Sequence, residues 1–145
     1  MSGGVKRVLA VASQGGHWRQ LSALAGAFEG HICRFVSTSP ELGDYCVRDC
    51  SRSKWWLGFI TAVQLAWIIG RYRPDVVVST GALPGLLSLI VARAFGARTI
   101  WIDSVANTER MSLSGRLCRP FAGLWLTQWP KVSAETGAEY AGSVL

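Results

Sequence analysis

Three polar stretches that contain glycine hold the residues whose types and spacing could do chemistry. They are "ASQGGH" at residues 12–17, "STGALPG" at 79–85 and "IDSVANTERMSLSGRL" at 102–117. Adjacent glycines let backbone N–H groups approach a ligand closely, and a helix that starts there favours an anion. The imidazole of His17 can act as a base near neutral pH. Taken alone, the first stretch fits a phosphate-binding loop, a catalytic loop or a tight turn with a surface histidine.

Common cofactor and metal motifs are missing from the sequence. Gly15 and Gly16 lack the G-x-G-x-x-G spacing, and "VSTS" stands where a dinucleotide-binding sheet has an acidic residue for the ribose. No G-K-[ST] follows the glycines, which argues against a P-loop. The sequence has four cysteines but no C-x-x-C pair, and it has no D-x-D carboxylate pair. We therefore expect no cofactor and no metal.

The composition fits one globular domain over residues 1–145. Half of the residues are apolar and 17% are charged, and the formal net charge is +6. A basic surface attracts nucleic acid, anionic lipid and phosphorylated substrates alike. The sequence lacks a run of five basic residues and the spacing of known DNA-binding motifs, so nucleic acid is disfavoured. The apolar run "VLAVA" is too short for a signal peptide, so we expect a cytosolic location with reduced thiols.

Apolar runs typical of strands alternate with helical patterns. We expect strands at residues 5–13, 31–39, 45–47, 74–81, 97–104 and 123–129, and helices at residues 17–28, 54–72 and 84–95. This alternation predicts an α/β fold with a Rossmann-like, doubly wound parallel sheet. Because the polar stretches follow strands, we expect them to meet at the carboxyl edge of the sheet and to share a ligand cleft.

Five motifs carry a resemblance to a known family. "ASQGGH", "RPDVVVSTGALPG", "WIDS", "SLSGRL" and "LTQWP", in this order, resemble bacterial polysaccharide-synthesis glycosyltransferase subunits of the PssD/CpsF type. Those subunits are similar to the membrane-anchor subunit of the eukaryotic two-subunit UDP-N-acetylglucosamine transferase and to the N-terminal half of MurG. The resemblance implies the N-terminal acceptor domain of a GT-B glycosyltransferase. It also implies that a partner protein supplies the donor-binding domain, since an intact enzyme would continue beyond "EYAGSVL".

The resemblance and the polar stretches together select the candidate site residues. His17 would be the general base or would bind the acceptor diphosphate. Asp103 is a second catalytic candidate, although it stands where relatives have the longer glutamate. The residues expected to bind substrate are Gly15, Gly16, Ser79, Thr80, Gly81, Gly85, Ser104, Asn107 and Arg110.

The stretch "WWLGFITAVQLAWII", residues 55–69, contains no charge, and two basic residues stand on each side of it. At ~1.5 Å per residue it reaches ~22 Å, too short to span a bilayer core of ~30 Å. One apolar stripe holds Trp56, Ile60, Val63 and Trp67, and another holds Trp55, Phe59, Ala62, Ala66 and Ile69. The helix is either an inner helix of the core or partly sunk in a membrane interface. In the second case Trp55, Trp56, Phe59 and Trp67 would contact the membrane.

These expectations lead to one main hypothesis of function and two alternatives. The main hypothesis is a membrane-associated, acceptor-binding subunit of a two-subunit glycosyltransferase at the cytoplasmic face of the inner membrane. Such an enzyme would move a sugar from a UDP-sugar to a polyprenyl-diphosphate-linked saccharide in exopolysaccharide or capsule synthesis, and this chain alone would be inactive. The first alternative is a non-catalytic scaffold that anchors and activates a catalytic partner. The second is a stand-alone nucleotide-binding enzyme.

Overall fold

The strands form one parallel sheet. The computed structural model describes residues 4–144. Within them, seven strands pair in the order β3-β2-β1-β4-β5-β6-β7, and every pair of neighbours is parallel. They are β1 (Arg7–Val11), β2 (Ile32–Ser37), β3 (Tyr45–Cys46), β4 (Val76–Ser79), β5 (Arg98–Ile102), β6 (Leu124–Thr127) and β7 (Glu139–Tyr140). The predicted doubly wound parallel sheet is confirmed.

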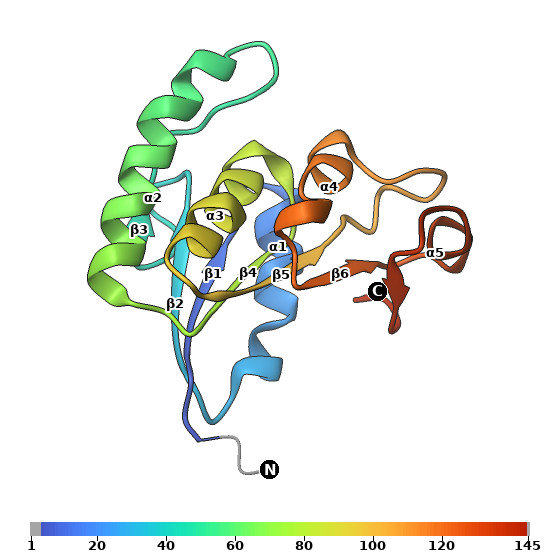
Figure 1. Cartoon of the computed structure of the whole chain (residues 1–145), viewed down its shortest axis with the longest axis horizontal. Helices are drawn as coiled ribbons and strands as arrows, with labels where there is room; N and C mark the ends of the chain where they lie inside the picture. The colour runs from blue at the N-terminus through green and yellow to red at the C-terminus, as the bar shows by residue number, and fades with distance from the viewer. Residues whose placement is uncertain (1–3, 145) are drawn as a thin grey trace.

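Helices cover both faces of this sheet. The α-helices are α1 (Gly16–Ala23), α2 (Gly58–Tyr72), α3 (Ala82–Ala94), α4 (Leu113–Leu117) and α5 (Pro130–Thr136). Three short 3₁₀ turns are η1 (Ala25–Phe28), η2 (Trp55–Leu57) and η3 (Arg119–Phe121). Figure 1 shows α2, α3 and α4 side by side in front of the sheet, with α1 behind it. The chain therefore has the three-layer arrangement of a doubly wound fold.

The long elements match the sequence expectations better than the short ones. The expected helix at residues 17–28 is divided, because α1 ends at Ala23 and η1 continues as a 3₁₀ turn. Helices α4 and α5 and strand β7 were not predicted. They have only two to seven residues, too few to display a hydrophobic period. Helix α5 packs through Val132 in a small cluster with Met111 and Ala138.

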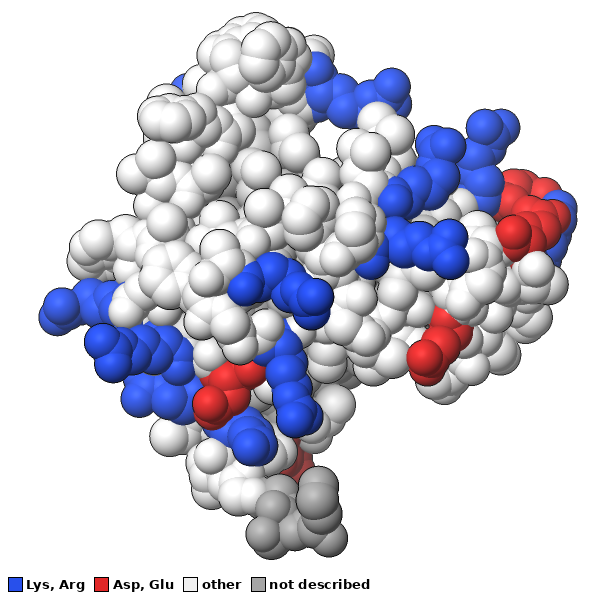
Figure 2. All heavy atoms as spheres, viewed as in Figure 1, with Lys and Arg blue, Asp and Glu red and all other residues white. Residues whose placement is uncertain are grey.

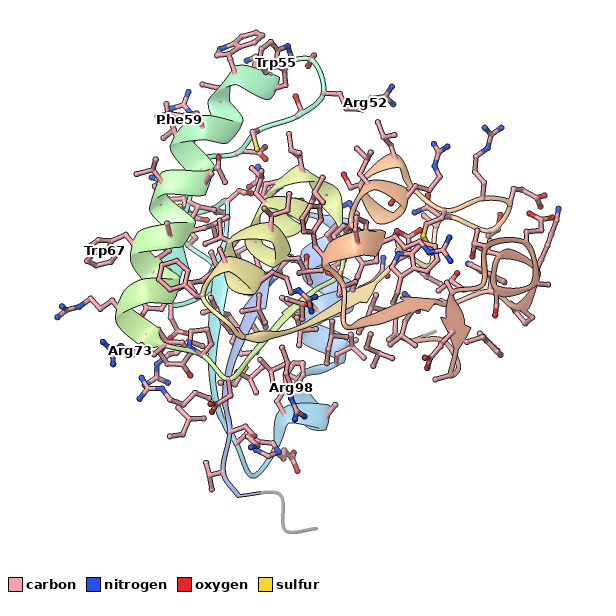
Figure 3. All side chains as sticks on the ribbon, in the orientation of Figure 1. Arg52, Trp55, Phe59, Trp67, Arg73 and Arg98 are labelled. Atoms are coloured by element: carbon pink, nitrogen blue, oxygen red, sulfur yellow. The ribbon has the colours of Figure 1, made fainter. Side chains whose placement is uncertain are left out.

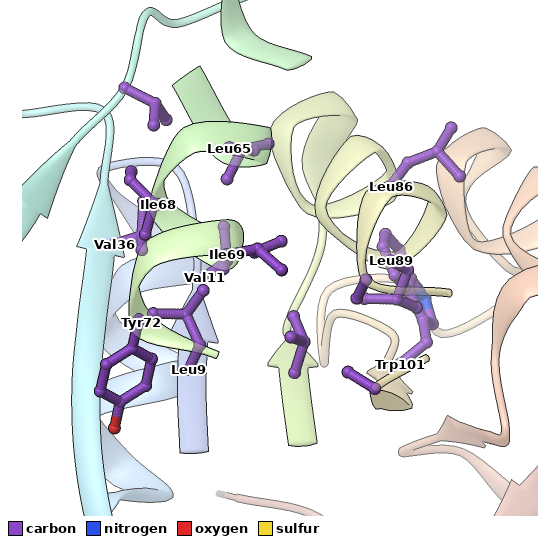
Figure 4. Close-up of a cluster of buried hydrophobic side chains, with 14 of the residues drawn as sticks. Leu9, Val11, Val36, Leu65, Ile68, Ile69, Tyr72, Leu86, Leu89 and Trp101 are labelled. Atoms are coloured by element: carbon purple, nitrogen blue, oxygen red, sulfur yellow. The ribbon is translucent and has the colours of Figure 1, made fainter. Parts of the chain in front are cut away.

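Helix α2 packs on the sheet through one buried stripe. Its Ile68 lies beside Val36 of β2, and Leu65 and Ile69 lie on the side of α2 that faces α3 (Figure 4). The Tyr72 hydroxyl donates hydrogen bonds to the carbonyl oxygens of two strands, Val8 and Ile32, at 3.3 and 3.0 Å. Ile69 is only 1% exposed, so its assignment to the same stripe as Trp55 and Phe59 is wrong. The helix belongs to the outer layer, which corrects the inner-helix alternative.

The order of the strands reverses between β1 and β4. From β1 the chain passes through α1 behind the sheet to β2, and from β4 it passes through α3 in front of the sheet to β5. The helices that follow β1 and β4 therefore lie on opposite faces, and a ligand crevice is expected at the carboxyl edge beside the loops after these two strands. Such a switch point is where doubly wound sheets bind ligands.

Helix α3 lies so close to β4 that only a glycine fits at position 85. A Cβ on Gly85 would lie 2.1 Å from Ser79 Oγ and 3.4 Å from the Trp101 ring. We expect Gly85→Ala to lower the free energy of unfolding by about 1–3 kcal/mol through overpacking, as measured by urea denaturation. Gly26→Ala is the control, since a Cβ there has open space. Equal stability of the two variants would contradict this account.

Candidate functional site

Two glycine loops meet at the switch point through a pair of hydrogen bonds. The Thr80 hydroxyl donates to the His17 carbonyl oxygen at 2.7 Å, and His17 Nδ1 lies 3.2 Å from the Thr80 carbonyl oxygen. Because a carbonyl oxygen can only accept, His17 Nδ1 is the donor in the second bond. In the neutral imidazole this leaves Nε2 with its lone pair free to accept a proton.

The imidazole of His17 rests directly on Gly81 of the second loop. A Cβ at Gly81 would lie 2.4 Å from His17 Nδ1, so this approach requires glycine. The next residue, Ala82, has φ 67°, which is a strained conformation for an alanine. The second loop thus adopts an uncommon backbone that supports the side chain of the first loop.

Several residues expected to bind substrate are instead part of the framework. The Thr80 side chain is fully buried (0% exposed), and so is that of Ser79, whose hydroxyl accepts a hydrogen bond from the Gly81 N–H at 3.3 Å. Gly81 and Gly85 are buried as well. These four residues position His17 and the start of α3, and their contact with substrate stays a prediction.

Asp103 is likewise a structural residue. Its carboxylate is 1% exposed and accepts hydrogen bonds from Trp101 Nε1, Asn107 Nδ2, the Ser112 amide and the Ser112 hydroxyl at 2.6–3.1 Å. Both carboxylate oxygens are therefore occupied by the chain itself. The carboxylate thus holds the 103–112 loop closed, and the catalytic role predicted for Asp103 stays a prediction that these internal hydrogen bonds do not favour.

A buried network of two glutamines escaped the sequence analysis. Gln20 Nε2 donates to Ser104 Oγ at 3.0 Å, and Gln128 Nε2 donates to Gln20 Oε1 at 2.8 Å and to the Asp103 carbonyl oxygen at 2.9 Å. Ser104 is buried in this network, and its hydroxyl is already bonded to Gln20, so its predicted contact with substrate stays a prediction. The only available signal was Gln128 in the "LTQWP" motif, since its partner Gln20 lies 108 residues away.

Fewer of the predicted site residues are accessible to a ligand than expected. Gly15 and Gly16 are exposed, His17 and Asn107 are half-buried, and Arg110 is exposed. In residues 4–144, no buried side-chain nitrogen or oxygen lacks a hydrogen-bond partner. A ligand here would thus meet loop backbone, the His17 imidazole and exposed side chains. The same residues contain no group of three or more His, Cys, Asp or Glu that could hold a metal ion.

The thiol of Cys118 lies beneath the 103–112 loop and is inert. Burial raises its pKa to about 12, and the nearby Asp103 carboxylate raises it further. The protonated thiol donates a hydrogen bond to the Gly115 carbonyl oxygen at 3.1 Å. Because the thiolate is the reactive form of cysteine, Cys118 is not a nucleophile near neutral pH.

Large apolar side chains cover the outer side of α2 and of the turn before it. This apolar face consists of Trp55, Trp56, Phe59, Ile60, Val63 and Trp67, of which Trp55 is 70% and Phe59 is 77% exposed. Figure 3 shows Trp55, Phe59 and Trp67 directed away from the sheet, with Arg52 and Arg73 at opposite ends of the helix. The surface over α2 is almost free of charge in Figure 2. None of the helices in the described part of the chain is long and apolar enough to cross a bilayer.

The fold is shared with solved structures of sugar-nucleotide enzymes. MurG of Acinetobacter baumannii superposes with a TM-score of 0.78 and 12% identity, over 97% of this chain and 46% of that one. The UDP-N-acetylglucosamine 2-epimerase of Rickettsia bellii superposes with a TM-score of 0.74 and 13% identity, over 97% and 45%. The chain thus has the Rossmann-like fold of the N-terminal domain of GT-B glycosyltransferases.

The sequence assigns the chain to a more specific family than the fold comparison does. Residues 50–144 match the model of the family described as oligosaccharide biosynthesis protein Alg14 like, and the chain belongs to this family. The UDP-N-acetylglucosamine transferase subunit ALG14 of Yarrowia lipolytica is 32% identical, over 59% of this chain and 42% of the relative. The mouse subunit of the same name is 25% identical, over 86% and 76%. The chain therefore matches less than half of the length of the fungal relative.

The role of Asp103 predicts a loss of stability when its charge is removed. In the variant Asp103→Asn, an amide N–H₂ replaces an acceptor that faces N–H and O–H donors. We expect a decrease in the free energy of unfolding of at least about 2 kcal/mol in urea denaturation. Glu41→Gln, at an exposed position, is the control. A variant as stable as the original chain would argue against the structural role.

Proposed function

We propose that this chain is the acceptor-side, membrane-associated subunit of a UDP-N-acetylglucosamine transferase. The observation that carries the proposal is the apolar face of α2, exposed on a domain whose relatives are named as subunits of such a transferase. The acceptor would be a polyprenyl-diphosphate-linked saccharide, as in the PssD/CpsF type of surface polysaccharide synthesis. A donor-binding subunit would complete the enzyme, and residues 1–145 would act as its acceptor domain.

The apolar face of α2 suits attachment to a membrane surface. Tryptophan side chains favour the boundary between headgroups and acyl chains, and basic residues at both ends of the helix favour anionic headgroups. A helix lying in this interface would bring the crevice close to an acceptor that never leaves the bilayer. The location we propose is the cytoplasmic face of the inner membrane, with the chain peripheral or partly inserted.

His17 is the residue we propose for acid–base chemistry. In an inverting transfer, the acceptor oxygen forms a bond to the anomeric carbon while the bond from that carbon to UDP breaks. The proton of the acceptor hydroxyl would go to His17 Nε2, since Nδ1 is directed to the Thr80 carbonyl oxygen. The partner would hold the donor, and bringing the two reactants together supplies ~7–11 kcal/mol of the barrier.

The scaffold alternative has one observation in its favour. Asp103 is buried and its carboxylate already accepts several hydrogen bonds. Among the two predicted catalytic residues, only His17 is then accessible to act as an acid or base, which is little catalytic machinery for an enzyme. If the partner supplies the general base, this chain would only anchor the partner and present the acceptor. The two functions differ in whether turnover depends on His17.

Membrane attachment through α2 predicts the behaviour of a double variant. Replacing Trp55 and Phe59 by serine removes two exposed apolar anchors without opening the core. We expect co-sedimentation with anionic liposomes to fall sharply while the thermal unfolding curve stays unchanged. The control is Tyr140→Ser, another exposed aromatic residue, on the far edge strand β7. Sedimentation that the double variant leaves unchanged would defeat the membrane-contact proposal.

Reconstitution with a donor-domain partner tests the catalytic proposal. The pair should transfer N-acetylglucosamine to a polyprenyl-diphosphate acceptor, and the isolated chain should give no turnover. His17→Ala should lower kcat of the pair by roughly 10²–10⁴-fold with partner affinity unchanged. His17→Asn is the matched variant, because its amide N–H can replace Nδ1 toward the Thr80 carbonyl oxygen but it has no basic Nε2.

The outcomes of this experiment separate the candidates. Loss of turnover in both variants supports the general base, whereas full activity in both supports the scaffold. Activity kept only by His17→Asn assigns the imidazole a positioning role. Turnover by the isolated chain, or calorimetric binding of a UDP-sugar to it, would favour the stand-alone nucleotide-binding enzyme.

A further inference from the structure

A cavity of about 640 Å³ lies outside the switch-point crevice, between α2 and the segment that precedes it. Residues 46–51 form one wall, and Leu57, Ile60 and Gln64 form the other. None of these residues is among the predicted site residues, and the chemistry proposed for His17 does not use them. The cavity therefore needs its own explanation.

The wall of this cavity is fixed to α2 by its backbone. The Thr61 hydroxyl donates to the Arg48 carbonyl oxygen at 2.6 Å, and the Arg48 amide donates to Gln64 Oε1 at 2.6 Å. The backbone N–H and carbonyl oxygen of Arg48 are thus both hydrogen-bonded to α2, while the Arg48 side chain is exposed. The cavity is preformed, and its cationic side chain can respond to a ligand without breaking these bonds.

The lining combines apolar and charged groups. Val47, Leu57 and Ile60 contribute hydrocarbon, whereas Arg48 and Lys54 contribute two positive charges against the single negative charge of Asp49. Ile60 also belongs to the apolar face of α2, so the cavity adjoins the surface proposed to meet the membrane. A ligand matching this lining has an apolar chain and an anionic head.

The cavity also adjoins the glycine loop of the crevice. Thr38 lines it, and Thr38 Oγ1 accepts a hydrogen bond from the Gln14 amide at 3.0 Å. Gln14 directly precedes Gly15 in the first loop. The cavity therefore lies between the apolar face of α2 and the loop that carries His17.

We propose that this cavity binds the diphosphate of a membrane-embedded polyprenyl diphosphate, with Arg48 and Lys54 pairing with its oxygens. The assignment rests on the proposed function and deepens it by separating two roles. The isoprenoid chain runs over Ile60 toward the bilayer, and the saccharide extends past Thr38 toward His17. His17 then faces the reacting sugar hydroxyl, and the cavity holds the diphosphate. Guanidinium and ammonium groups are the side chains that bind phosphate oxygens most strongly.

Binding of geranylgeranyl diphosphate to the isolated full chain, in neutral phosphatidylcholine vesicles, tests this assignment. Neutral vesicles exclude the general attraction of a basic protein to anionic lipid. Arg48→Gln with Lys54→Gln should weaken binding about tenfold or more, because two charge-assisted contacts are lost. Asp49→Asn should strengthen binding, since it removes the opposing charge.

The matched control is Arg93→Gln with Arg98→Gln, which removes the same charge at the other end of the sheet. Figure 3 shows Arg98 far from Arg52 and Trp55, which lie near the cavity wall. This variant should bind the probe as the original chain does. Equal affinities of all the variants, or equal losses in both double variants, would overturn the assignment.

Two further probes identify which part of the ligand is recognised. Geranylgeraniol and inorganic diphosphate should each bind far more weakly than the complete probe. Inorganic diphosphate that binds equally well would mean a site for free phosphate, and geranylgeraniol that binds equally well would mean an apolar groove only. Either result overturns the proposal.

This assay and the reconstitution can fail independently. The reconstituted pair could be active while binding of the probe is unchanged by the substitutions at Arg48 and Lys54. This result would overturn the cavity assignment but not the proposed function. Conversely, binding of the probe could depend on Arg48 and Lys54 while the pair shows no transfer. This result would overturn the proposed function but not the cavity assignment.

Discussion

The reciprocal contact between His17 and Thr80 organises the carboxyl edge of the sheet. It joins the loops of β1 and β4 at the point where their helices leave for opposite faces. Without a Cβ at Gly81 the imidazole can lie on the second loop, and the Nδ1 hydrogen bond then sets its tautomer. The polar groups beneath this contact are satisfied by one another, so the crevice offers a ligand mainly backbone and one imidazole.

The apolar residues of α2 and of the turn before it lie in two environments, the protein core and the exposed surface. Leu65, Ile68 and Ile69 are buried in the core, whereas Trp55, Phe59 and Trp67 are exposed on the outer side. An unpartnered face of this size is uncommon on a soluble domain and indicates an interaction surface. Lipid and protein partners both bury apolar area, and the cations near both ends of the helix favour an anionic membrane.

Most polar side chains of the third polar stretch hydrogen-bond within the chain itself. Asp103, Ser104 and Gln128 are buried, and their hydrogen bonds close a loop that has little regular structure of its own. A half-satisfied network of this kind would be costly in a low-dielectric interior, which explains why its members bind one another so completely. This arrangement stabilises the loop after β5 at the carboxyl edge of the sheet.

The order of the longer strands and helices was determined by the sequence alone, because buried strands and long amphipathic helices have periods that can be counted along the chain. The short elements α4, α5 and β7 have no such period. The motifs at the strand ends are local, so the sequence also indicated a relation to the membrane-anchor subunit of the UDP-N-acetylglucosamine transferase, whereas the PssD/CpsF assignment stays a prediction. Tertiary structure decided which polar side chains reach solvent: Ser79, Thr80 and Asp103 face inward because α3 and the 103–112 loop close over them. It also decided which side of α2 is covered. Burial and hydrogen-bond partners depend on residues up to 108 positions apart, and no local pattern in the sequence contains that information.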